Sequence, residues 1–171
     1  MGIIFAVILR WMGRLWICDC GIGLYTFDAA GAETSQHLLD PYSLSHILHG
    51  VIFFWFLDAW AHRISWPTRL LLAIGIEMGW EVFENTPMVI DRYRSETAAR
   101  GYTGDSILNS FGDVLSCAFG FWLTHKKGLG FGVALFLFIE FIMLVLYRDN
   151  LTLNVLMLLF PIDAIRVWQM G

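Results

Sequence analysis

The sequence predicts an all-α membrane protein: a polytopic bundle of about five transmembrane helices, followed by a proline-broken apolar helix near the C-terminus. Hydrophobic residues make up 57% of the 171 residues and charged residues 15%, whereas an ordinary soluble domain has about 25% charged residues. Apolar runs approach the length of about 20 residues that a spanning helix needs. Charged residues, glycine and proline separate these runs.

The expected spans belong to one integral membrane domain. They cover residues 3–17, 45–61, 68–85, 105–124 and 129–147. The glycine-rich stretch 18–44 and the polar stretch 86–104 are expected to connect them. Residues 151–168 are apolar but contain Pro161, so they are expected to form a sixth, kinked span or a re-entrant helix.

Basic residues predict the orientation of the bundle. The connections around Arg63 and Arg69 and around Lys126 and Lys127 carry no acid, so they are expected on the cytoplasmic side. The outward loop would be 86–104, where acidic residues balance Arg92, Arg94 and Arg100. The composition and the orientation together predict a multi-pass membrane protein.

Three cysteines are present. Cys18 and Cys20 form a C-x-C pair; a disulfide between them would close a very short loop, so we expect none. The pair supplies only two of the four ligands usual in a structural zinc site. Cys117 lies in an apolar stretch and is expected to be a small core residue.

Ionisable residues within the expected spans form three helical stripes. They are His46 and His49; Glu77, Glu81 and Glu84; and Asp105, Asn109 and Asp113. Spacings of three and four place each set on one helix face. Each charge costs about 2.5–3.5 kcal/mol inside a bilayer, so such residues need a function or a partner. Gly112 and Gly120 would let a neighbouring helix approach closely.

The predicted topology brings all three stripes to the outer half of the bundle. We therefore expect one polar cavity that opens to the external side. Its expected lining is His46, His49, Glu81, Glu84, Asp105, Asn109 and Asp113, with Arg92 and Arg94 as a cap and Arg10 and Arg14 within reach.

Two chemistries fit this lining. Imidazole and carboxylate groups could bind a divalent metal ion, with His46, His49, Glu81 and Asp105 as ligands. Without metal, the same groups could transfer protons. In either case His49, Glu81, Asp105 and Asp113 are the expected catalytic residues. The expected ligand-binding residues are His46, Glu84, Arg92, Arg94 and Asn109.

A structural interpretation stands beside this one. Buried carboxylates could pair with the arginines and tie helices together. The two histidines could lie at the membrane interface, near the capping residues Ser43 and Ser45. Glu77, nearer the middle of its helix, could be a helix-to-helix hydrogen-bond partner.

Several runs resemble a bacterial inner-membrane family of unknown function over most of the chain. They are SQHLLDPYSLSHILHG, EMGWEVFENTPMVIDRYR, YTGDSILNSFGD and RDNLTLNVLMLLFPIDAIR, with MGR and IC-x-CG near the N-terminus. No activity comes with that resemblance.

A more distant resemblance, over roughly residues 42–122, is to the VanZ-like proteins associated with glycopeptide resistance. Their pattern pairs a histidine, a glutamate on the next helix and D-x-x-x-N-x-x-G on the following one. His49, Glu77 or Glu81, and the run that begins at Asp105 match it, although the basic residue that often precedes the histidine is missing. This resemblance implies a role in the cell envelope.

The expected function is to bind or modify a phosphorylated envelope lipid. If the protein is an enzyme, it would be a metal-assisted hydrolase or transferase acting on a lipid-linked anionic substrate. Membrane lipid is the expected partner, with a membrane protein or a second copy as further candidates. The net charge of -4 indicates no nucleic-acid partner. The alternatives are a small ion-coupled transporter and a non-catalytic membrane subunit or assembly factor.

Overall fold

The structure, a computed structural model, describes residues 1–97, 99 and 101–171. Arg100, which entered the orientation argument, therefore lies outside the described residues. Eight helices are present in the described part: α1 (Gly2–Trp11), α2 (Ser43–Trp60), α3 (Trp66–Glu84), α4 (Pro87–Glu96), α5 (Ile107–Lys127), α6 (Leu129–Tyr147), α7 (Leu151–Leu159) and α8 (Asp163–Gln169). One isolated bridge joins Tyr25 and Leu39.

The expectation of about five transmembrane spans is wrong. Among the described residues, two helices, α5 and α6, are long and apolar enough to cross a membrane. Helix α1 has 10 residues, and a rise of about 1.5 Å per residue makes it half as long as a hydrocarbon core of about 30 Å. Helices α7 and α8 have 9 and 7 residues and are shorter still.

Helices α2 and α3 are long enough to cross a membrane but are not apolar enough. They have 18 and 19 residues, but both carry several ionisable side chains. The histidines of α2 and the three glutamates of α3 lower the apolar content below that of a spanning helix. The ionisable residues that we expected inside the bilayer therefore make α2 and α3 too polar to count as spanning helices.

The two apolar helices are a coarse indication of membrane association. Most of α5 is buried inside the protein, as the core helix of a soluble protein can be, whereas most of α6 is exposed. The exposed face of α6 carries Leu137, Phe138, Phe141 and Leu146. Apolar surface on this scale usually contacts a membrane or a partner.

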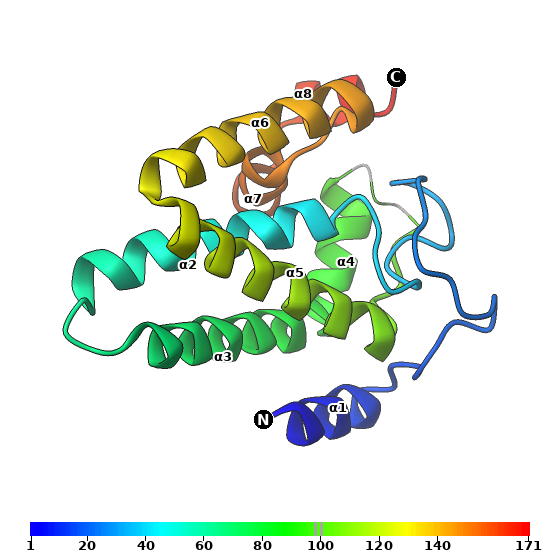
Figure 1. Cartoon of the computed structure of the whole chain (residues 1–171). Coiled ribbons are helices and arrows are strands. Elements are labelled where there is room, and N and C mark those ends of the chain that lie inside the picture. Colours follow the sequence, from blue (N-terminus) through cyan, green and yellow to red (C-terminus); the bar gives the residue numbers. More distant parts are fainter. Residues whose placement is uncertain (98, 100) are drawn as a thin grey trace.

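Helices α2 and α5 pack closely along their lengths, with α3 and α6 on either side (Figure 1). Glycine makes this approach possible: a Cβ on Gly50 would overlap the carbonyl of Cys117, and a Cβ on Gly120 would overlap the carbonyl of Ile47. Gly112 leaves room in the same way for the carbonyl of Leu38. The predicted close approach of a helix is confirmed at Gly120, whereas the neighbour of Gly112 belongs to the loop before α2.

Two connections differ from expectation. Part of the expected loop 86–104 folds into α4, which begins with Pro87 at its first position after Thr86; proline is favoured there because its missing N–H needs no partner. The C-terminal apolar segment is broken near Pro161, as expected, into α7 and α8.

The long loop between α1 and α2 lies against the start of α5 (Figure 1). The Ser106 N–H donates to the carbonyl of Ser35, and the Ser106 hydroxyl donates to the carbonyl of Gln36. The Asn109 amide donates to the carbonyl of His37. The start of α5 thus fixes residues 35–37 beside the carboxylates of α3.

Candidate functional site

The centre of the site joins α2 to α3. The Nδ1 atom of His46 lies 2.5 Å from Oε1 of Glu77, and the Nδ1 atom of His49 lies 3.0 Å from the same oxygen. Glu77 is fully buried and His46 is 6% exposed. One buried carboxylate therefore holds two imidazole rings from the neighbouring helix.

Two further carboxylates surround His46. Its Nδ1 lies 3.4 Å from Oε1 of Glu81, and its Nε2 lies 3.9 Å from Oδ2 of Asp113 on α5. The Ser43 hydroxyl donates to Oδ1 of Asp113 over 2.7 Å. Both carboxylate oxygens of Glu81 are buried without a hydrogen-bond partner in the described structure. His46 is therefore the shared cation partner of three acids from two helices.

Asp105 lies in the loop before α5, and both of its carboxylate oxygens accept hydrogen bonds. The Tyr102 hydroxyl donates to its Oδ1 over 2.9 Å, and the Asn85 amide donates to its Oδ2 over 2.5 Å. The Asp105 N–H donates to the amide oxygen of Asn85. This reciprocal pair joins the end of α3 to the start of α5 and fixes one wall of the site.

These groups face a cavity of about 60 Å³. Its lining includes His46, His49, Trp80, Glu84, Asp105 and Asp113, with Tyr42, Tyr93 and Tyr102 above them. Loop residues Ala29–Gly31, Thr34 and Ser35 and, from α7, Leu151, Asn154 and Val155 complete it. A water molecule occupies about 30 Å³ in the liquid, so the cavity admits an ion with a few waters or one small anionic group.

The structure brings together most of the residues expected at the site. His46, His49, Glu84, Asp105 and Asp113 line the cavity, and Glu81 lies directly behind His46. Asn109 is fully buried and is used to hold the carbonyl of His37, so it does not reach the cavity lining.

The arginines expected as a cap lie elsewhere. The Nε of Arg92 donates to the carbonyl of Leu158, and its guanidinium lies 4.0 Å from Glu96. Arg94 is exposed on α4. Arg14 donates to the carbonyl of Thr103, and Arg10 donates to that of Arg14. These four side chains are not among the described lining residues.

Glu77 is the residue of the site that the sequence pattern assigns to another role. The pattern predicts a helix-to-helix hydrogen-bond partner, and this is confirmed, because the Glu77 carboxylate on α3 contacts both histidines of α2. The same contacts place Glu77 at the centre of the site, which the pattern did not predict. The signal was present, because Glu77 stands four residues before Glu81 on the same stripe. The tyrosines of the lining gave no comparable signal, since they come from three separate segments.

Burial raises the pKa of two acids that line the cavity, Glu84 and Asp105. The pKa of Glu84 is raised to about 7 by burial and by the nearby charge of Asp105. The pKa of Asp105 is raised to about 6, because its burial outweighs the hydrogen bonds from Asn85 and Tyr102. Near neutral pH these two carboxyl groups can therefore take up or release protons, which is typical of functional sites.

Replacing Glu84 by glutamine is expected to stabilise the metal-free protein at alkaline pH. The carboxyl group, with its folded-state pKa raised from 4.5 to about 7, makes the wild type lose stability as the pH rises through that interval. We expect Glu84→Gln to raise the free energy of unfolding by about 1–3 kcal/mol at pH 8. Denaturant unfolding in chelator-containing buffer should show the gain at pH 8 and none below pH 4.5. An equal gain at both values would contradict a charge effect.

Two ligand groups for a metal ion are present at the site. They are His46, His49 and Glu77, and His46, Glu81 and Glu84; within each group the ligand atoms lie within 4.8 Å of one another. Neighbouring ligands of a tetrahedral ion, bonded at about 2.1 Å, stand roughly 3.4 Å apart. The contacts of Glu77 with His46 and His49, at 2.5 and 3.0 Å, would therefore lengthen when an ion enters. Two imidazoles with a carboxylate suit zinc, iron and manganese.

Comparison with known proteins gives a consistent family result. Residues 9–171 match the family model described as a protein of unknown function (DUF2585). A UPF0314 protein of Rhizobium meliloti is 47% identical over 161 residues, which cover 94% of this chain and 82% of that protein. A UPF0314 protein of Paracoccus denitrificans is 41% identical over 168 residues, with 98% and 87% covered. No solved structure was found to match the chain.

Proposed function

We propose a function from the site itself, because the chain belongs to the DUF2585 family, whose description carries no activity. The protein would be a membrane-associated protein that binds a divalent metal ion and, through this ion, the phosphate group of an envelope lipid. The observation that carries the proposal is the contact of His46 and His49 with one buried carboxylate, Glu77.

The charge of the site favours a cation as its first ligand. Glu84, Asp105 and Asp113 line the cavity, and Glu77 and Glu81 lie behind the histidines. A buried carboxylate that accepts no hydrogen bond is costly, and neither oxygen of Glu81 is hydrogen-bonded in the described structure, although His46 lies 3.4 Å away. A divalent ion bound by His46, His49 and Glu77 would lower this cost.

The ion would then attract an anionic group. A lining dominated by carboxylates repels phosphate by itself, whereas a bound divalent ion inverts the local charge and polarises a phosphoryl oxygen. The cavity of about 60 Å³ has room for such a group but not for acyl chains, since pockets for drug-sized ligands measure about 300–1,000 Å³.

A lipid is the proposed source of that group for two reasons. The exposed apolar face of α6 supports contact with a membrane. The apolar residues Leu151 and Val155 of α7, with Trp80 of α3, form part of the same lining as the acids. The likeness of His49, Asp105, Asn109 and Gly112 to the VanZ-like pattern supports an envelope role.

The test measures binding of phosphatidic acid to the detergent-purified protein by native mass spectrometry, with Mn²⁺ and with chelator. We expect one lipid adduct in the presence of Mn²⁺ and its loss with chelator, since the phosphate is held through the ion. His49→Gln should lose both the ion and the adduct. Asp91→Asn, which removes an exposed carboxylate of α4, should keep both. Equal lipid binding with and without metal would contradict the proposal.

A second candidate is an ion-coupled carrier that uses protons rather than metal. One observation favours it: Glu77, His46, Asp113 and Ser43 form a continuous chain of contacts from α3 through α2 to α5. Ser43 continues this chain to Asp40 through its backbone N–H. A protein that binds no divalent ion but takes up protons near neutral pH would favour this candidate.

A further inference from the structure

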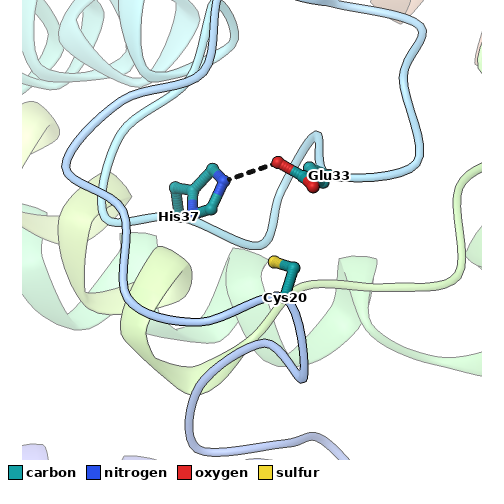
Figure 2. A group of neighbouring side chains, drawn as sticks. All are labelled: Cys20, Glu33 and His37. Atoms are coloured by element: carbon teal, nitrogen blue, oxygen red, sulfur yellow. Dashed lines mark hydrogen bonds and ion pairs between the residues drawn. The ribbon is translucent and has the colours of Figure 1, made fainter.

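A second group of metal-binding side chains lies outside the cavity, in the loop between α1 and α2. Cys20, Glu33 and His37 place one ligand atom each within 4.8 Å of one another (Figure 2). None of the three belongs to the lining of the cavity. The group therefore needs an explanation separate from that of the central site.

Backbone pairing brings these residues together. The Leu38 N–H donates to the carbonyl of Gly23, and the Leu39 N–H donates to that of Leu24. A Cβ on Gly23 would overlap the ring of His37, so the absence of a side chain there lets the chain that follows Cys20 run beside the imidazole. The spacing of four residues then places Glu33 next to His37, with Nε2 and Oε2 3.0 Å apart.

The three side chains are oriented and accessible as ligands should be. His37 is 8% exposed, and the Asn109 amide holds its backbone carbonyl. Its Nδ1 is buried with no hydrogen-bond partner in the described structure. The side chain of Glu33 is 58% exposed, and Cys20 is exposed as well, so an ion can enter from solvent.

The oxidation state of Cys20 decides whether its sulfur can bind an ion. In the structure Cys20 is bonded to Cys18 in a disulfide, contrary to our expectation of unpaired cysteines. Their Cα atoms are 5.0 Å apart, within the usual range, because the irregular chain after α1 can turn between them. The thiolate, and not the disulfide sulfur, is the metal ligand.

We propose that reduction of the Cys18–Cys20 disulfide opens a Zn²⁺ site whose protein ligands are Cys20, Glu33 and His37. A dithiol supplies the two electrons and two protons: the Cys18–Cys20 bond breaks, two thiols form, and the dithiol becomes a disulfide. Zinc binding then releases the thiol proton of Cys20. Zinc accepts thiolate sulfur, imidazole nitrogen and carboxylate oxygen as ligands, and water can take a position that the protein leaves open.

The site would control one side of the cavity. Residues Ala29–Gly31, Thr34 and Ser35 lie between Cys20 and His37 in the chain and belong to the lining. An ion bound at Cys20, Glu33 and His37 would fasten both ends of this segment. The reduced, metal-loaded form would therefore have a more rigid cavity wall than the reduced, metal-free form.

The test uses Co²⁺ as a spectroscopic probe, titrated into the purified full-length protein before and after reduction with a phosphine. The phosphine takes an oxygen atom from water while the disulfide becomes two thiols. We expect the reduced protein to bind one Co²⁺ with a thiolate-to-metal charge-transfer band that Zn²⁺ displaces. The oxidised protein should lack the band. The ligands proposed for the central site, His46, His49 and Glu77, are nitrogen and oxygen atoms and give no such band, and Cys117→Ser tests the one thiol that lies beside Glu77.

Matched variants locate the sulfur ligand. Cys20→Ser should abolish the band after reduction, whereas Cys117→Ser should keep it. Cys18→Ser cannot form the disulfide and should give the band without reductant. His37→Asn and Glu33→Gln should each weaken binding by about tenfold or more, while His62→Asn, an exposed histidine elsewhere, should not. The absence of the band in reduced wild type, or its persistence in Cys20→Ser, would overturn the proposal.

Discussion

Replacing His46 by alanine is expected to lower the free energy of unfolding by about 3–5 kcal/mol, the usual cost of leaving a buried charge without its partner. The imidazole lies 2.5 Å from Glu77, 3.4 Å from Glu81 and 3.9 Å from Asp113. Glu77 and Glu81 are fully buried, so water cannot replace the lost contacts. Denaturant unfolding in mild detergent, in the presence of a chelator, measures the effect.

A double mutant separates charge from packing. Glu77→Gln removes the carboxylate that His46 neutralises, so His46→Ala with Glu77→Gln should be less destabilised than His46→Ala alone. If His46→Ala only left an empty space in the core, the two substitutions would lower the free energy of unfolding additively. Additive free energies in the double-mutant cycle would therefore show that His46 contributes volume rather than charge.

Replacing Gly50 by alanine is expected to cost about 2 kcal/mol or more, at the upper part of the range for an overpacked core. The new Cβ would overlap the backbone of Cys117 and Phe121 on α5. Backbone atoms cannot rotate away as a side chain can, so α2 and α5 must separate. The separation would also move His46 away from Asp113 on α5.

Gly79→Ala provides the matched control. Gly79 lies in α3, and a Cβ added there would have open space within 4 Å. Alanine also exceeds glycine in helix propensity by about 1 kcal/mol. The same chemical change should therefore stabilise the protein at position 79 and destabilise it at position 50. Equal effects at both positions would contradict the close approach of α2 and α5.

Much of the site could be predicted from helical spacing. The stripes of α2, α3 and α5 do converge, because residues three and four apart share a helix face whatever surrounds the helix. His46, His49, Glu84 and Asp113 follow from this spacing and line the cavity, whereas Asp105, expected on the helix, lines it from the loop before α5. The close approach of α2 at Gly120 was predicted from the position of this glycine near the stripe of α5.

The number of spans could not be predicted in this way. Apolar length alone does not distinguish a lipid-facing helix from one that is buried in the protein, and α5 is mostly buried while α6 is mostly exposed. Helices α2 and α3 have the length of spans, but their histidines and glutamates lower their apolar content. Polar side chains that satisfy one another inside a protein core do not require a membrane around them.

The contacts of the long loop were also beyond the sequence pattern. Cys20 and His37 are brought together by backbone pairing between residues 23–24 and 38–39, which leaves no periodic signal in an irregular segment. The arginines illustrate the same limit, since Arg92 and Arg14 donate to backbone carbonyls that no spacing rule identifies.

The most direct measurement is a calorimetric titration of Mn²⁺ into the oxidised protein, in which the disulfide keeps the sulfur of Cys20 from binding. Wild type is expected to bind one ion with proton release, because a metal-bound histidine must be neutral. The pKa of His46 is raised, since the neighbouring carboxylates outweigh the lowering effect of its burial. His49→Gln should abolish this binding, and His62→Gln should leave it unchanged. Equal binding by all three proteins, or none by wild type, would contradict a metal site at His46, His49 and Glu77.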